Sequence, residues 1–440
     1  MNFLLNVNLV LLTQVAVYSL AFALRVMIAR ALGAEGQGEY SLFLLVVSVA
    51  SSVATLGMSL GNVYFIGKGK HPLRVLLANS HLLVLAVAVV ASAVVLAVGL
   101  GLEPRAFVSG NAFWLYALAV PALMEFVLLT ALLQGSSRFL ALNIAVFARG
   151  FIVVPAAAVL WAGGWLTIFS LLAAWVGSYI LADIVALGAI GVRNWLARPR
   201  WAVVREQIGF GAPGQVATIV QFLNYRLDQF LVVAFLTTAA VGYYAVAVGV
   251  GESVWWIGNS VVTVLLPRLT GMKAEEAAEL TPLMCRNTML VSLAAAVVLA
   301  LASPLAIELA FGEEFSPAVA PLLWLMPGVV ALSGAKILSS YIFSQGRVIL
   351  NTYAAAISLA VTLLFDLLLI PRFGISGAAI ASSLAYGTAF VLTLYWYRRL
   401  SGNNVWEAVI PRGSDARLYL DVARRLGGPV FGGPVGKGYG

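Results

Sequence analysis

The sequence predicts an all-α integral membrane protein, with about twelve transmembrane helices in two pseudo-symmetric six-helix lobes around a central cavity. Of its 440 residues, 62% are hydrophobic and only 10% are charged, whereas soluble proteins carry about 25% charged residues. The apolar residues form long runs, and a bilayer-spanning helix needs about 20 such residues. Short patterns from the first half of the chain recur in the second half, which indicates an internal duplication.

The apolar runs set the expected helices and the division of the chain. Helices are expected near residues 4–29, 40–66, 75–100, 113–133, 143–162, 166–190, 211–236, 242–266, 284–310, 318–343, 351–370 and 375–397. We therefore expect an N-terminal six-helix lobe, a cytoplasmic interfacial linker, a C-terminal six-helix lobe and a basic, partly disordered cytoplasmic tail, over residues 1–190, 191–210, 211–397 and 398–440. Tryptophans among arginines in the linker favour a short helix at the membrane surface, although a solvated connector fits equally well.

The basic residues predict the orientation, because cytoplasmic connections are enriched in Lys and Arg. One set of alternate connections, together with the tail, contains most of these residues, whereas the opposite set contains only Arg30, Arg105 and Arg372. Both termini are therefore expected in the cytoplasm. This asymmetry also accounts for the net charge of +8, so a nucleic-acid partner is not expected.

Three kinds of match reveal the repeat. The pattern from Leu32 to Tyr40 recurs from Leu236 to Tyr244, an offset of 204. Gln134-Gly135, followed by Asn143, recurs as Gln345-Gly346, followed by Asn351, with offsets of 211 and 208. Gly164 matches Gly374 at an offset of 210. Because each unit holds an even number of helices, the two halves insert with the same orientation and face each other across a cleft.

The most informative polar segment is Asn224 to Gln229, in the middle of an apolar run. A mid-membrane Arg or Asp costs roughly 3 kcal/mol on insertion scales, so Arg226 and Asp228 need a protein interior or a wet cavity. They point about 200° apart on a helix and are not expected to pair with each other. A structural charge satisfied by a neighbouring helix is the simpler alternative.

Other membrane helices also carry ionisable groups, and each of these either lines a wet cavity or is paired with a group on a neighbouring helix. The remaining intramembrane cations are Arg25, Arg149 and Lys336, and the anions are Glu125, Asp183, Asp228, Glu252 and Asp366. We expect Arg149 and Asp183 to form an ion pair, and Arg25 either faces the cavity or snorkels to the outer interface. Guanidinium groups bind two phosphate oxygens at once, so cavity arginines suit a diphosphate ligand.

These arguments define two sets of candidate residues. The candidate substrate-binding residues are Arg25, Arg226, Lys336, Glu252, Tyr18, Asn224 and Trp256. The candidates for coupling to protons or sodium are Asp228, Asp366 and Glu125. With one cysteine, Cys285, and two histidines, the chain is expected to hold no internal disulfide, metal site or cofactor.

Five segments resemble Wzx-type polysaccharide flippases of the MOP superfamily. They are RALGAEGQGEYS at 30–41, VGYYAVA at 241–247, LPRL at 266–269, FGEEF at 311–315 and LIPRFGISGAAIAS at 369–382. The resemblance spans residues 1 to about 400 and implies two lobes that rock between inward-open and outward-open states. It implies a cargo of oligosaccharide on a polyprenyl diphosphate, such as undecaprenyl diphosphate, moved to the outer leaflet of a bacterial or archaeal cytoplasmic membrane.

The resemblance also implies membrane lipids and polysaccharide-assembly proteins as partners. Arg25 and Arg226 occupy places comparable to cavity cations of the superfamily, although five carboxylates here accompany four cations. An ion-coupled exporter of small cationic compounds on the same scaffold is the alternative. A membrane enzyme is disfavoured, because the longest external connection, near residues 101–112, carries only Glu103 and Arg105 as charged groups.

Overall fold

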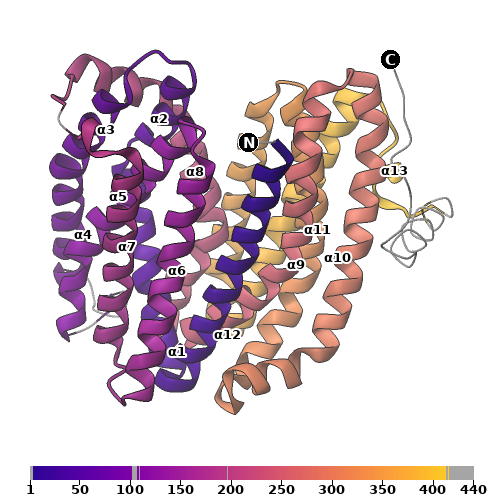
Figure 1. The fold of residues 1–440 in the computed structure, drawn as a ribbon. Helices are drawn as coiled ribbons and strands as arrows, with labels where there is room; N and C mark the ends of the chain where they lie inside the picture. The colour runs from indigo at the N-terminus through magenta and orange to yellow at the C-terminus, as the bar shows by residue number, and fades with distance from the viewer. Residues whose placement is uncertain (1–2, 102–106, 109, 196, 413–414, 416–440) are drawn as a thin grey trace, which may run out of the picture. The chain divides into compact units, whose positions relative to one another are not determined.

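In a computed structural model of the chain, helices form all the regular structure of the described residues, which are 3–101, 107–108, 110–195, 197–412 and 415 (Figure 1). The elements are α1 Phe3–Ala54, α2 Met58–Gly67, α3 Leu73–Leu83, the π-helix η1 Val84–Ala88, α4 Val89–Gly101, η3 Gly110–Leu115, α5 Tyr116–Gly135, α6 Phe139–Ala162, α7 Ile168–Ile190, η4 Val192–Asn194, α8 Trp201–Phe235, α9 Thr238–Gly271, α10 Ala274–Phe311, η5 Glu313–Ala318, α11 Val319–Ser344, α12 Val348–Ser401 and α13 Trp406–Val409.

Two of these helices are double passes. With 52 and 54 residues, α1 and α12 are about twice as long as a bilayer requires. Each folds back at a glycine with left-handed backbone, Gly33 at φ 66° and Gly374 at φ 59°. Within the described residues, nine helical segments are long and apolar enough to cross a membrane. Counting α1 and α12 twice and adding α8, whose polar stretch lowers its hydropathy, the described chain makes the expected twelve passes.

The helices fall into two compact units. The first unit contains residues 1–252, 299–328 and 355–388, and the second contains 253–298, 329–354 and 389–440. Phe43 and Tyr116 pack in the core of the first unit, with ring centroids 4.6 Å apart. Tyr341 and Tyr397 pack in the core of the second, at 5.1 Å. The division into lobes at residues 191–210 stays a prediction.

Inside the first unit, the two sequence repeats touch through matched glycines. A Cβ atom on Gly38 would overlap the carbonyl oxygen of Thr238, and one on Gly242 would overlap that of Ala34. Gly38 and Gly242 are 204 residues apart in the sequence, and so are Ala34 and Thr238. The contact is therefore reciprocal, and it confirms the first of the predicted matches.

The second predicted match is correct in kind but wrong by two residues. The amide of Arg138 donates to Leu133 and that of Arg347 donates to Ile342, so the turns correspond at an offset of 209. At that offset Ser137, at φ 54°, replaces Gly346, at φ 72°. Gly135 has another role: a Cβ there would lie 3.0 Å from the α-carbon of Val63, so it allows close packing on α2.

The start of α8 is fixed to the first repeat. Residues 201–210 are the first turns of the 35-residue α8 rather than a separate short helix. The Gln207 side chain donates to Asn62 Oδ1 at 2.6 Å and accepts from Asn79 Nδ2 at 2.8 Å, and all three residues are fully buried. A fully satisfied buried polar network of this kind fixes a single register.

At one end of the first unit, the end predicted to be outside, two charged side chains connect α1 to α10 and η5. The Arg30 guanidinium donates to the last carbonyls of α10, at 2.6 Å from Leu309 O and 3.1 Å from Ala310 O. Glu314 accepts from the amide of Ala34 at 3.0 Å, where α1 resumes after Gly33. A cation at a helix C-terminus and an anion at an N-terminus both oppose the partial charge there.

The described part of the tail is held by one buried ion pair. Arg286 binds both carboxylate oxygens of Asp415, each at 2.7 Å. The glycine-rich end of the tail, expected to be disordered, lies outside the described residues.

Candidate functional site

The polar stretch of α8 directs its side chains to two different places. Arg226 lines a pocket against α1, whereas Asp228 contacts residues of α9 and α12. Residues two apart on a helix differ by about 200° in direction, so the Arg226 and Asp228 side chains point into different surroundings. Asn224 accepts a hydrogen bond from Thr362 at 3.1 Å and is buried on the same side as Asp228.

The pocket beside Arg226, here called the arginine pocket, has a volume of about 240 Å³. Both sequence repeats contribute to its lining, which consists of Arg25, Tyr40, Ser41, Leu44, Leu45, Ser48, Phe222, Arg226, Gln229 and Ala245. Its two charged lining residues are both arginines. A hollow lined by both repeats, with polar groups converging on it, is the feature expected of a ligand site.

Arg25 enters this pocket across a gap left by a glycine. Its Nη1 lies 3.5 Å from the carbonyl oxygen of Ala245 on α9. A Cβ on Gly249, one helical turn further along α9, would overlap the same Nη1. The guanidinium therefore rests against α9, and the snorkelling alternative for Arg25 is not observed.

Arg226 has a carboxylate partner. Its Nη2 lies 2.8 Å from Glu252 Oε1, with 25% of the Arg226 side chain and 16% of the Glu252 side chain exposed. Arg25 and Tyr18 also lie within electrostatic range of Glu252. One carboxylate thus serves two guanidinium groups, so the pocket retains a positive charge that an anionic ligand would neutralise.

The second place reached by α8 holds two buried carboxylates, here called the carboxylate pair. Asp228 accepts hydrogen bonds from Tyr244 Oη at 2.5 Å and Ser382 Oγ at 3.1 Å. Asp366 is fully buried, lies within electrostatic range of Asp228, and has no hydrogen-bond partner for either carboxylate oxygen among the described residues. An unpartnered buried carboxylate requires a proton or a cation for neutralisation.

One predicted contact in the first repeat is wrong. Arg149 does not pair with Asp183; its Nη1 donates to Tyr179 Oη, and its guanidinium lies 5.0 Å from the centre of that ring. Nearby, His81 Nδ1 lies 2.9 Å from Glu125 Oε1. Asp183 Oδ1 is buried without a hydrogen-bond partner among the described residues.

The remaining candidate residues lie in the second unit. Lys336 donates to Asn259 Oδ1 at 2.7 Å, and its Nζ lies 4.2 Å from the Trp255 ring centre. Trp256 is half-buried on α9. Over the part of the chain that the structure describes, no group of three or more His, Cys, Asp or Glu side chains could hold a metal ion.

Comparison with known proteins identifies the family. The model of the family described as "Polysaccharide biosynthesis protein" matches residues 26–320, more than half of the chain. The chain belongs to the polysaccharide biosynthesis protein family. One curated relative, a probable low-salt glycan biosynthesis flippase Agl15 of Haloferax volcanii, is 25% identical over 240 residues. That alignment covers 52% of this chain and 48% of the relative, so the chain spans about half the length of the curated relative it matches.

Solved structures confirm the MOP fold for this member of the polysaccharide biosynthesis protein family. The lipid II flippase MurJ, in an inward closed conformation, superposes with a TM-score of 0.70 at 12% identity, over 97% of this chain and 93% of that one. An inward-facing multidrug resistance MATE transporter of the MOP superfamily gives a TM-score of 0.65 at 14% identity, over 88% and 94%. At these identities the likeness concerns the fold.

Several residues of the site in this family member were not anticipated from the sequence. Gly249 carries no charge, and no sequence pattern marks it. Its role, to leave space for the Arg25 guanidinium, is visible only from the position of that side chain. Tyr244 and Ser382 are common residue types that become notable because both donate to Asp228. Arg149 was recognised from the sequence as an intramembrane cation. Its predicted partner was Asp183, whereas the structure places it against Tyr179.

Proposed function

We propose that the protein is a flippase that moves a polyprenyl-diphosphate-linked oligosaccharide from the cytoplasmic to the outer leaflet by alternating access. The arginine pocket is the observation that carries this proposal. It is lined by both repeats, it contains Arg25 and Arg226, and one carboxylate, Glu252, lies close to both guanidinium groups. Membership of a polysaccharide biosynthesis family and a relative named as a glycan flippase support the same function.

In this proposal the diphosphate replaces Glu252 as the partner of Arg226. The guanidinium of Arg226 offers a planar pair of donors, which matches two phosphate oxygens. Arg25 approaches from the first repeat and contacts the other side of the same ligand. Because the donors come from different repeats, movement of one repeat against the other changes the number of contacts to the headgroup.

Alternating access would require separation of α1 from α10 and η5 at the end of the first unit where Arg30 and Glu314 connect them. The contacts to be broken there are those of Arg30 and Glu314 with backbone groups, and the close approach at Gly38 and Gly242. Helix-end contacts of this kind contribute about 0.3–1 kcal/mol each when exposed, which is small enough for reversible opening. We place this end outside and both termini in the cytoplasm of a bacterial or archaeal cytoplasmic membrane, because the basic residues gather at the opposite side.

The carboxylate pair is our candidate for ion coupling. Asp366 has no hydrogen-bond partner among the described residues, and it lies within electrostatic range of Asp228, which accepts a hydrogen bond from Ser382. Oxygen ligands of this type suit a proton or a hard cation such as sodium. Glu125 is a weaker candidate because the His81 ring already lies 2.9 Å from its Oε1.

Arg226→Ala tests the function. In vesicles containing a fluorescent polyprenyl diphosphate glycan, the variant should lose flipping while retaining wild-type thermal stability in detergent. Arg193→Ala, at an exposed residue of the connection before α8, is the matched control and should flip normally. Full flipping by the Arg226 variant would remove the proposal.

Export of small cationic compounds is the second candidate, and the carboxylate pair is the observation that favours it. Such a protein would use Asp228 or Asp366 to bind its cargo and would not need Arg226. Drug resistance conferred on a sensitive strain by the wild-type chain, with no flipping of the diphosphate lipid in vesicles, would support this alternative.

A further inference from the structure

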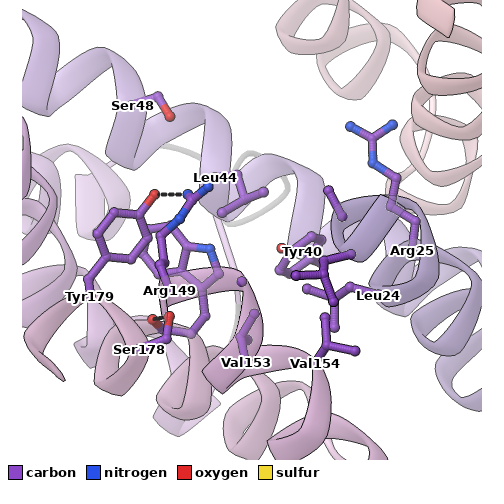
Figure 2. Close-up of a pocket in the computed structure, with 14 residues that line it drawn as sticks. Leu24, Arg25, Tyr40, Leu44, Ser48, Arg149, Val153, Val154, Ser178 and Tyr179 are labelled. Atoms are coloured by element: carbon purple, nitrogen blue, oxygen red, sulfur yellow. Dashed lines mark hydrogen bonds between the residues drawn. The ribbon is translucent and has the colours of Figure 1, made fainter. Parts of the chain in front are cut away.

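The first repeat contains a second pocket, which the flippase proposal leaves without a role. Its volume is about 220 Å³ and its walls come from α1, α6 and α7 (Figure 2). Polar and aromatic side chains make up much of the lining: Arg25, Tyr40, Ser48, Arg149, Trp175, Ser178 and Tyr179. We call it the Arg149 pocket.

Arg149 brings an uncompensated charge to this pocket. Its guanidinium donates to Tyr179 Oη and stacks near that ring, and no carboxylate pairs with it among the described residues. Its Nε is buried and has no hydrogen-bond partner among the described residues. Arg149 is therefore a half-buried cation that contacts a phenol and has no anionic partner among the described residues, and a partly desolvated charge gains from pairing with an anion.

The other lining residues indicate what kind of anion fits. The pocket is smaller than the roughly 300–1,000 Å³ of sites for drug-sized ligands, so it holds one ring rather than an oligosaccharide. Tyr40, Trp175 and Tyr179 offer aromatic surface to the apolar face of a ring, and Ser48 and Ser178 offer hydroxyl groups. A guanidinium binds a carboxylate through two parallel hydrogen bonds.

The position of the pocket relates it to the proposed headgroup site. The Arg149 pocket and the arginine pocket share Arg25, Tyr40, Leu44 and Ser48 in their linings. Figure 2 shows Arg25 and Arg149 at opposite sides of the Arg149 pocket. A diphosphate between Arg25 and Arg226 would therefore lie next to the residues that the two pockets share, with its attached glycan near the Arg149 pocket.

We propose that the Arg149 pocket binds a carboxylate-bearing sugar, such as a uronic acid, of the lipid-linked glycan. This inference rests on the proposed flippase function and adds a preference for acidic cargo to it. Arg149 recognises the sugar carboxylate, and Tyr179 holds the guanidinium in position. The competing explanation is purely structural, in which Arg149 only ties α6 to α7 through Tyr179.

The test uses two probes that differ in a single group. They are short-chain polyprenyl diphosphates carrying either glucuronic acid or glucose, and their dissociation constants are measured on the full-length protein in nanodiscs. Wild-type protein should bind the glucuronic acid probe at least tenfold more tightly, because a hydrogen-bonded charge pair contributes about 1.5–3 kcal/mol. Arg149→Gln should abolish that preference and leave the affinity for the glucose probe unchanged.

Two further variants separate the possible outcomes. Tyr179→Phe removes the Arg149–Tyr179 bond that positions the guanidinium but keeps the charge, so the preference for the acidic probe should be reduced and not abolished. Arg226→Gln should weaken both probes equally, and failure of that effect would count against the headgroup site rather than the Arg149 pocket. The inference is overturned if the wild type shows no preference, or if Arg149→Gln lowers the affinity for both probes and the melting temperature alike.

Discussion

Replacing Gly249 with Ala should weaken binding of a polyprenyl diphosphate without unfolding the protein. A methyl group at this residue would occupy the space of Arg25 Nη1. The obstructed group is the far end of a flexible side chain, so we expect Arg25 to move while α9 keeps its path. The variant thus removes Arg25 from its resting place without changing any charge.

The size of the effect follows from the contact that is lost. A hydrogen bond between charged groups contributes about 1.5–3 kcal/mol, which corresponds to roughly a 10- to 100-fold increase in the dissociation constant. Stability should not fall, because Ala is favoured over Gly inside a helix by about 1 kcal/mol. The affinity for the polyprenyl diphosphate should therefore fall while the thermal stability does not.

The assay is titration of a short-chain polyprenyl diphosphate into purified protein in nanodiscs, with thermal unfolding followed in parallel. Gly177→Ala is the matched control, because that glycine lies within α7 and a Cβ there would meet nothing within 4 Å. Arg25→Gln alone and Arg25→Gln combined with Gly249→Ala should bind the diphosphate equally weakly, because the two changes remove the same contact. Wild-type affinity in Gly249→Ala, with weakened binding in Arg25→Gln, would refute the reasoning.

Three other predictions follow from the site and from α8. Glu252→Gln should tighten diphosphate binding by about tenfold, because it frees Arg226 from its counter-ion, and should slow release in a single-turnover flipping assay; an unchanged dissociation constant would contradict this role. Asp366→Asn should make flipping in vesicles indifferent to sodium and pH gradients, and a retained response would exclude Asp366 from coupling. Hydrogen bonds from Lys70 and His71 hold the pKa of the Glu206 carboxyl below its usual range, so their contribution to docking of α8 is complete above about pH 4.3 and disappears as pH falls through the lowered pKa. Hydrogen exchange in the first turns of α8 should increase at that acid step, and the step should be missing in Glu206→Gln; an identical acid response in both proteins would argue against this pairing.

The sequence was sufficient for the architecture, because helix length, hydropathy and the repeat are all local or periodic signals. The offset of 204 between Gly38 and Gly242 was visible in the letters and corresponds to a real contact. The equivalence of Gly135 and Gly346 was misleading because the two glycines meet different needs, close packing on α2 in one and a left-handed turn in the other. Similar residues therefore do not ensure a similar backbone.

The partners of the intramembrane charges were harder to predict. Depth along each helix placed Arg149 near Asp183, but pairing also requires that the helices be rotated so that the side chains face each other. One sequence provides no measure of that rotation, and Arg149 contacts Tyr179 instead. The same limit explains why Gly249 escaped notice, since its value depends on the end of a side chain that starts on another helix.

The crossed contact of Gly38 with Thr238 and of Gly242 with Ala34 has the form of an isologous interface, in which one patch meets a copy of itself about a two-fold axis. Two separate half-length chains could pair through this patch with a single glycine serving both sides. Gene fusion would then have converted the homodimer interface into a contact within one chain. Each half would afterwards be free to acquire its own charged residues, such as Arg25 in the first half and Arg226 in the second.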